Sequence, residues 1–176
     1  MNVLLTTKLP IEGFTSISEH NIIMPEAAKF TPTELIEHLA DADILLSTFD
    51  YKITAEMIAA APNLKLITNF GVGFNNVDIA AARDRGIPVT NTPGPVIEPT
   101  AEHAFTLMLA ICHRTAELDR RMRQPNSDIE FGVMNNLGIA IYGKTLGIIG
   151  MGNIGQSIAG RAIACGMKII YNNRRR

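Results

Sequence analysis

The segment GKTLGIIGMGNIGQSIAGRAIACGMKIIYNNRRR, from Gly143 to Arg176, decides the fold of the C-terminal part of this chain. Its apolar run Thr145–Ile149 predicts a short buried strand, and three glycines with the spacing GxGxxG follow it directly. Apolar residues at helical spacing then predict a helix over Ile154–Cys165, and Lys168–Tyr171 predicts a second strand. This order of strand, glycine turn, helix and strand is typical of a dinucleotide-binding unit.

The glycines stand where a dinucleotide needs them. Gly150 permits the tight turn, Gly152 lets a pyrophosphate approach the backbone, and Gly155 lets the helix and the strand pack closely. The helix N-terminus then presents unpaired N–H groups and a partial positive charge to the phosphates. A glycine turn that only joins a strand to a helix is the alternative, but it does not explain three glycines at these offsets. The expected contacts are Gly150, Met151, Gly152, Asn153, Ile154 and Gly155.

The end of the second strand indicates which dinucleotide binds. An acidic residue about 20 residues beyond the glycines would bind the ribose 2′-hydroxyl of NAD. Here Asn172 and Asn173 precede Arg174, Arg175 and Arg176, so no carboxylate repels a 2′-phosphate. Guanidinium groups can bind a phosphate bidentately, so Asn173, Arg174 and Arg175 are predicted to bind NADP, with NAD as the second choice. A solvated basic tail is the alternative interpretation of the arginines.

Composition limits the other classes of function. The chain has 176 residues, 47% of them hydrophobic and 19% charged, and a net charge of −1, so no global field attracts nucleic acid or a membrane. Cys112 and Cys165 lie in predicted helices without metal or redox spacing, which indicates buried thiols in a reducing cytoplasm. Met1–Pro10 lacks the basic start and the long apolar run of a signal peptide. We therefore expect a cytoplasmic protein with no metal site and no nucleic-acid or membrane partner.

The first 90 residues alternate between short apolar runs and helical or connecting segments. Thr31-Pro32-Thr33-Glu34 has the pattern of a capping box, and Thr54 and Asp78 are expected to cap two further helices. This alternation predicts an α/β fold with a parallel sheet of the flavodoxin-like kind. The expected strands are Asn2–Thr6, Ile22–Met24, Ile44–Ser47, Leu64–Thr68 and Pro88–Thr90.

Proline and glycine in Asn91–Pro95 mark a domain boundary, which predicts one domain over residues 1–95 and a second over residues 96–176. The second begins with a long helix, about Thr100 to Met122, for which Thr100 is the expected N-cap. Its apolar residues lie on more than one side, so we expect it to be buried on more than one side.

Four motifs in register resemble those of the D-isomer-specific 2-hydroxyacid dehydrogenases. They are NFGVGFNNVD at residues 69–78, GIPVTNTPG at residues 86–94, Thr100-Ala101-Glu102, and GKTLGIIGMGNIG at residues 143–155. The resemblance covers nearly the whole chain. It implies a flavodoxin-like substrate domain and a truncated Rossmann cofactor domain, an active site in the cleft between them, and a homodimer formed largely through the helix at residues 100–122.

The resemblance also implies roles for individual residues. Backbone N–H groups at Val72 and Gly73 would bind the substrate carboxylate, in keeping with an anion nest at a glycine-flanked turn. The alternative is that Gly71 and Gly73 only shape this turn. Thr100 would reach the cofactor near its nicotinamide. The tail YNNRRR resembles that of NADPH-preferring glyoxylate and hydroxypyruvate reductases, which implies a small 2-oxo acid as substrate.

In this family the catalytic arginine, glutamate and histidine lie beyond the second Rossmann strand, so no catalytic residue is expected within this chain. None of the four histidines falls in a matching motif; these are His20, His38, His103 and His113. Asp50 and Tyr51 either approach the substrate or belong to a surface loop. We therefore expect a truncated NAD(P)-dependent oxidoreductase that is inactive alone. The alternatives are a non-catalytic dinucleotide-binding module and a truncated product that only dimerises through the long helix.

Overall fold

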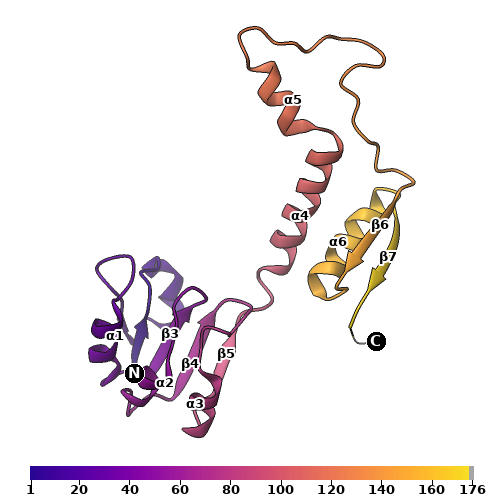
Figure 1. Cartoon of the computed structure of the whole chain (residues 1–176). Coiled ribbons are helices and arrows are strands. Elements are labelled where there is room, and N and C mark those ends of the chain that lie inside the picture. Colours follow the sequence, from indigo (N-terminus) through magenta and orange to yellow (C-terminus); the bar gives the residue numbers. More distant parts are fainter. Residues whose placement is uncertain (175–176) are drawn as a thin grey trace. The chain divides into compact units, whose positions relative to one another are not determined.

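Five parallel strands form the sheet of the first part of the chain, in the order β2-β1-β3-β4-β5 (Figure 1). This is the strand order of flavodoxin-like folds, so the predicted α/β architecture is confirmed. The computed structural model describes residues 1–174, and the chain divides into two units, Met1–Gly94 and Pro95–Arg176. The strands are β1 (Asn2–Leu5), β2 (Asn21–Ile23), β3 (Ile44–Thr48), β4 (Leu66–Phe70) and β5 (Val89–Asn91).

Side-chain caps begin each of the three α-helices in this unit, at the residues that the sequence indicates. In α1 (Pro32–Leu39), the Thr31 hydroxyl accepts a hydrogen bond from the Glu34 N–H, and the Glu34 carboxylate accepts one from the Thr31 N–H at 2.8 Å. This is the predicted capping box. The other two helices are α2 (Ala55–Ala59), capped by Thr54, and α3 (Ile79–Asp84), capped by Asp78.

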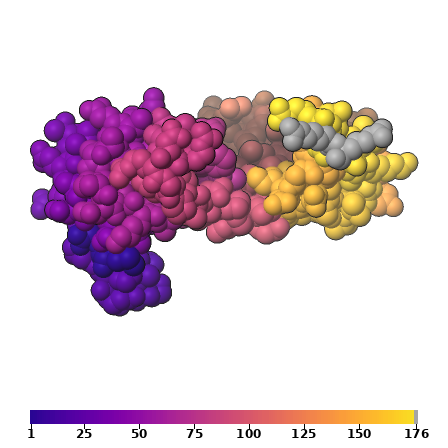
Figure 2. Space-filling view, turned by 90° about the horizontal axis from the view of Figure 1, so that it is seen from below, coloured from indigo at the N-terminus to yellow at the C-terminus, as the bar shows by residue number. Residues whose placement is uncertain are grey.

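A 3-10 helix, η1 (Ile11–Ile17), is the one element of this unit that the sequence pattern does not predict. It buries no residue, so it lacks the apolar period by which a helix is recognised in a sequence. In Figure 2 the N-terminal segment, in indigo and dark purple, forms a projection from the first unit.

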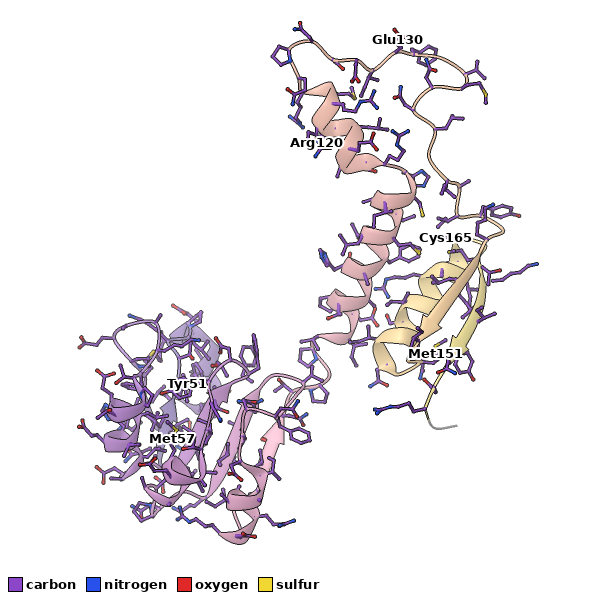
Figure 3. All side chains as sticks on the ribbon, viewed as in Figure 1. Tyr51, Met57, Arg120, Glu130, Met151 and Cys165 are labelled. Atoms are coloured by element: carbon purple, nitrogen blue, oxygen red, sulfur yellow. The ribbon has the colours of Figure 1, made fainter. Side chains whose placement is uncertain are left out.

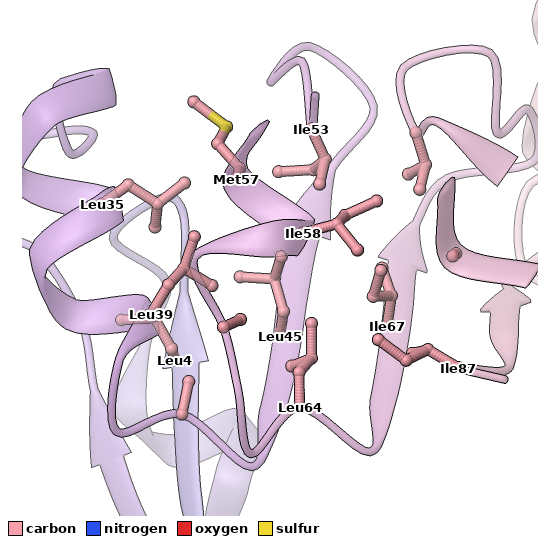
Figure 4. Close-up of a cluster of buried hydrophobic side chains, with 14 of the residues drawn as sticks. Leu4, Leu35, Leu39, Leu45, Ile53, Met57, Ile58, Leu64, Ile67 and Ile87 are labelled. Carbon is pink, nitrogen blue, oxygen red and sulfur yellow. The ribbon is translucent and has the colours of Figure 1, made fainter. Parts of the chain in front are cut away.

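The core of the first unit lies between one face of the sheet and helices α1 to α3 (Figure 4). Leu4, Leu45 and Ile67 are paired in register across β1, β3 and β4, so their side chains share a face. Leu35 and Leu39 of α1 are fully buried against this cluster. The hydrophobic effect on this face therefore fixes the register of the strands and the position of their carboxyl ends.

The second unit contains the predicted strand, glycine turn, helix and strand. These are β6 (Thr145–Ile149), α6 (Asn153–Ala164) and β7 (Lys168–Asn172), and the two strands are parallel. The expectation that the first strand is buried is wrong for this chain, because Ile149 is 95% exposed. Within residues 1–174, β6 has a strand on one edge only, so its other edge is open.

The predicted long helix is two helices, α4 (Ile97–Cys112) and α5 (Thr115–Met122). Arg114 separates them with a left-handed φ of 54°, which a continuous helix does not allow. The start is also different from our expectation: α4 begins before Pro99, and Val96 rather than Thr100 is the N-cap. Pro99 fits there because the first-turn N–H groups of a helix have no intrahelical partner, so its missing N–H costs no hydrogen bond.

The prediction that the long helix is buried on more than one side is also wrong for the described chain. Ala101 is the one buried residue of α4 among residues 1–174, and α5 has none there. Leu107 and Ile111 are 50% and 76% exposed, so an apolar surface of α4 faces solvent.

The cysteines are free thiols, as the sequence indicates, but they are not both buried. Cys112 is half-buried and Cys165, at the end of α6, is exposed (Figure 3). Through residue 174, the structure contains no helix with both the length and the apolar character that crossing a membrane requires.

Candidate functional site

The turn between β6 and α6 has the geometry that the three glycines predict. Gly150 has a φ of 97°, in the region that favours glycine, and this reverses the chain at the end of β6. A Cβ added at Gly155 would lie 2.3 Å from the Gly150 carbonyl oxygen, so glycine is required for the helix to approach the turn. At Gly152 an added Cβ would meet no atom of the described chain within 4 Å, which leaves the backbone accessible to a ligand.

The first turn of α6 is open to an anion. Its N-cap, Gly152, has no side chain to accept from the N–H groups of the turn, and the Gly152 carbonyl accepts the first helical hydrogen bond from the Gln156 N–H at 2.8 Å. The N–H groups at the start of α6 therefore combine with the helix dipole to favour a phosphate. Met151 lies in the turn, at the opposite end of α6 from Cys165 (Figure 3).

Asn173 is bonded to the glycine turn itself. Its side-chain oxygen accepts a hydrogen bond from the Met151 N–H at 2.7 Å, and the Asn172 carbonyl accepts from the Gly150 N–H at 2.9 Å. The end of β7 and the glycine turn are thus held together. Around them lies an open hollow of about 900 Å³, lined by Ile149, Gly150, Asn172, Asn173 and Arg174. Sequence spacing brings Asn173 to this place but does not predict its bond to Met151.

Arg174 is exposed at the edge of this hollow, where a cationic side chain can reach an anionic ligand. Arg175 was also expected to bind the cofactor, but it lies outside the described residues.

Thr100 lies in the first turns of α4, where it is exposed. The same end of α4 is joined to the nucleotide helix through Glu98, which sequence reasoning missed because its partners are about 60 residues away. One Glu98 carboxylate oxygen accepts from the Ser157 hydroxyl at 2.8 Å and the other pairs with Arg161 at 2.8 Å. The Arg161 guanidinium, followed by the Ser157 hydroxyl, lowers the pKa of Glu98 below its usual 4.5. These contacts tie the start of α4 to α6.

Val72 and Gly73 lie in the loop after β4, at the carboxyl end of the sheet, where ligands of parallel α/β folds bind. Both residues are exposed, and within residues 1–174 their N–H groups donate no hydrogen bond. Neither Gly71 nor Gly73 has a positive φ, so the nest of alternating left- and right-handed residues is not what orients these groups. Because these N–H groups are accessible donors, they can still form charge-assisted hydrogen bonds to a carboxylate.

Asp50 and Tyr51 belong to the loop after β3 and have different environments. Asp50 is exposed and pairs with Lys29, and hydrogen bonds from Lys29 and then Thr48 lower the pKa of its carboxyl group. Tyr51 is buried in the hydrophobic core, and burial raises the pKa of its hydroxyl group, which has no hydrogen-bond partner in the described chain. Asp50 therefore fits the surface-loop interpretation, whereas Tyr51, whose side chain lies in the core, fits neither interpretation.

The histidines lie outside the glycine turn and outside the Val72–Gly73 loop in the sequence, at positions 20, 38, 103 and 113. His38 packs its ring on Phe30 with ring centroids 4.8 Å apart, and His113 follows the last residue of α4. Among the described residues, no group of three histidine, cysteine or acidic side chains could hold a metal ion.

The family model described as D-isomer specific 2-hydroxyacid dehydrogenase, catalytic domain, matches residues 3–171, and the chain belongs to this family. A glyoxylate reductase of Korarchaeum cryptofilum is 40% identical over 171 residues, which are 96% of this chain and 52% of that protein. The chain spans about half the length of the curated relatives it matches.

Solved structures agree with the fold. The TT0316 protein of Thermus thermophilus superposes with a TM-score of 0.90 at 35% identity, over 100% of this chain and 57% of that one. An acyclic imino acid reductase in complex with NADPH and D-Arg gives a TM-score of 0.81 at 27% identity, covering 100% and 57% of the two chains. The NAD complex of a Staphylococcus aureus formate dehydrogenase gives 0.78 at 28% identity, covering 99% and 57%.

Proposed function

We propose that this chain is the N-terminal part of a reductase that transfers hydride from NADPH to the carbonyl carbon of a small 2-oxo acid, such as glyoxylate or hydroxypyruvate. The observation that carries the proposal is the open first turn of α6 behind a glycine turn whose third glycine cannot carry a Cβ. Its support from relatives is that both reductases and dehydrogenases of this fold are seen with a nicotinamide dinucleotide.

The residues of the turn divide the binding between them. The N–H groups at the start of α6, from Asn153 and Ile154, would bind the pyrophosphate, and Gly152 leaves room for it. Asn173 would hold the Met151 N–H in place and so keep the turn in its binding conformation. Thr100, by family resemblance, would contact the nicotinamide end. A bound nicotinamide dinucleotide supplies the hydride, while the protein binds and orients the reactants.

The preference for NADPH over NADH rests on the end of β7. Among residues 1–174, no carboxylate lines the hollow beside Asn173, and Arg174 lies there with a cationic side chain. Exchanging both Arg174 and Arg175 for aspartate should weaken NADPH binding much more than NADH binding, because only NADPH carries the 2′-phosphate. Equal losses for the two cofactors would mean that these arginines do not bind the 2′-phosphate.

The substrate carboxylate would bind the N–H groups of Val72 and Gly73. The proton donor would come from sequence beyond this chain, since none of the four histidines falls in a motif that the family resemblance identifies. The product of the native gene should therefore oxidise NADPH with glyoxylate and have about twice the 19.2 kDa mass of this chain. Protein of verified 176-residue length should show no turnover, and a steady-state rate from it would contradict the proposal.

A non-catalytic dinucleotide-binding module is the second candidate, because the described residues contain the complete glycine turn while none of the four histidines falls in a family motif. A native gene product of 19.2 kDa that binds dinucleotide without turnover would favour this candidate. Loss of folding or of dinucleotide binding would instead favour a product that only dimerises.

We further propose a cytoplasmic homodimer formed through α4, α5 and the segment that follows them. The support is the exposed apolar surface of this region, formed by Leu107, Ile111, Met122, Phe131, Val133, Met134, Leu137 and Ile139. Exposed large apolar side chains concentrated in one part of the chain are typical of an interface between subunits. Sedimentation equilibrium should give a dimer, and the exchange of Ile111 for glutamate should shift it towards monomer. A monomeric wild-type chain would contradict the proposal.

A further inference from the structure

The loop after β4 is held by its carbonyl oxygens. The Gly71 carbonyl accepts from the Thr92 N–H at 2.9 Å, and the Val72 carbonyl accepts from the Asn91 side-chain amide at 2.7 Å. The Gly73 carbonyl accepts from the Asn69 side-chain amide at 2.6 Å. Three successive peptide groups are thus bonded on the same side of the chain, towards β4, β5 and the residue that follows β5.

These bonds determine where the N–H groups point. A trans peptide group is planar, so its N–H is directed opposite to its carbonyl. Because the carbonyls of Gly71, Val72 and Gly73 are all bonded towards the sheet, the N–H groups of the residues after them point away from it. Those residues are Val72, Gly73 and Phe74, and all three are exposed.

Asn69 is itself fixed by a buried network. It is fully buried, and its side-chain oxygen accepts from the Ser47 hydroxyl at 2.8 Å and from the Asn76 amide at 2.9 Å. The Asn69 amide donates to Gly73 and to the Asn76 side-chain oxygen, so every hydrogen-bonding position of this side chain is used. A buried amide with all its partners present holds one orientation, because rotating it would leave polar groups unpaired.

We infer that Asn91 and Asn69 are positioning residues: Asn91 aims the Gly73 N–H and Asn69 aims the Phe74 N–H at a ligand carboxylate, while the Thr92 N–H orients the Val72 N–H through the Gly71 carbonyl. This inference rests on the proposed function of the loop and adds the cause of its geometry. Phe74 becomes a third donor of the site, next to the two that family resemblance implies. The two asparagines act through the carbonyls that they bind and do not touch the ligand.

Asn91 is the residue to test, because it is exposed and its exchange does not disturb the core. Asn91→Leu keeps the approximate size of the side chain and removes the donor, and Asn91→Gln restores a donating amide. The matched control is Asn75→Ala, since Asn75 is an exposed asparagine of the same loop whose side chain makes no hydrogen bond within residues 1–174.

Two NMR measurements on the ¹⁵N-labelled chain test the inference. Residual dipolar couplings report the direction of the Gly73 N–H, and a titration with oxamate reports carboxylate binding through the Val72 and Gly73 resonances. Neutral oxamide serves as the control ligand. Asn91→Leu should change the Gly73 coupling and weaken oxamate binding about ten-fold, as expected when a preoriented hydrogen bond to a charged group is lost. Asn91→Gln should recover part of the affinity, and Asn75→Ala should match wild type.

An unchanged Gly73 coupling in Asn91→Leu, or undiminished oxamate affinity in that variant, would overturn the positioning role. Failure of the proposed function is distinguished by the wild-type protein: if its Val72 and Gly73 resonances respond equally to oxamate and oxamide, the loop is not a carboxylate site, and the inference falls with it.

Discussion

The exchange of Gly155 for alanine tests whether close packing of α6 on the glycine turn holds the second unit together. The new Cβ would lie 2.3 Å from the Gly150 carbonyl oxygen and 3.4 Å from a methyl group of Ile148. The first distance is 0.7 Å inside the 3.0 Å that Cβ atoms respect, and its partner is a backbone atom, so the helix or the turn must move.

The energetic cost follows from two opposing terms. Overpacking of this kind costs about 1–3 kcal/mol. The greater helix propensity of alanine offsets at most about 1 kcal/mol of this cost. We therefore expect Gly155→Ala to lower the free energy of unfolding of the second unit by about 1–2 kcal/mol.

Gly160→Ala is the matched control, because Gly160 lies in the same helix and an added Cβ would meet no described atom within 4 Å. Here the propensity term acts alone and should stabilise the helix by about 0.5–1 kcal/mol. The two substitutions are chemically identical and are predicted to have effects of opposite sign.

Native-state hydrogen exchange of the α6 amides measures both effects, with the β3 amides of the first unit as an internal reference. Exchange in α6 should become about 5- to 30-fold faster in Gly155→Ala and slower in Gly160→Ala. If Gly155→Ala is as stable as Gly160→Ala, the turn can yield without cost and the packing argument is wrong.

Three further predictions concern single contacts. Arg161 lowers the pKa of Glu98 below 4.5, so the stability that this pair contributes is complete above pH 4.5. This stability is lost as the pH falls through the folded-state pKa of Glu98. Thermal melts of Glu98→Gln should lack this acid-dependent loss of stability. Asn173→Ala removes the acceptor of the Met151 N–H, so the exchange of that amide should rise about 3- to 10-fold while the α6 amides keep their rates. Thr31→Ala breaks the capping box and should destabilise the first unit by about 1 kcal/mol in urea unfolding; no change would show that solvent replaces the cap.

Local chemistry explains why much of the fold is predictable. Thr31, Thr54 and Asp78 each accept a hydrogen bond from a backbone N–H three residues ahead, so the information for these helix starts lies within four residues. The glycine turn is also determined locally, because the positive φ of Gly150 and the close approach of Gly155 to the Gly150 carbonyl oxygen both arise within the same short segment. The alternation of strands with helices along the chain is then sufficient to predict a parallel sheet.

The break between α4 and α5 shows what a local pattern does not contain. Arg114 takes a left-handed conformation, and its guanidinium binds the Glu117 carboxylate and the Leu137 carbonyl. The segment after α5 also crosses this junction, where the Ile139 N–H donates to the Cys112 carbonyl at 2.7 Å. Partners more than 20 residues away therefore contribute to the geometry at which the helix ends, while the apolar pattern from residue 100 to 122 continues without interruption.

The candidate site also combines features that are predictable from the sequence with features that are not. The geometry of the glycine turn is predictable, because the glycines themselves specify its backbone conformation. The orientation of the Gly73 and Phe74 N–H groups is not, because it depends on the side-chain amides of Asn91 and Asn69, which lie in two different strands. Those two strands are adjacent in the sheet, with Asn69 paired to Asn91 in register. In the proposed site, N–H donors that are aimed from a rigid sheet would bind a carboxylate without a charged side chain in the loop itself.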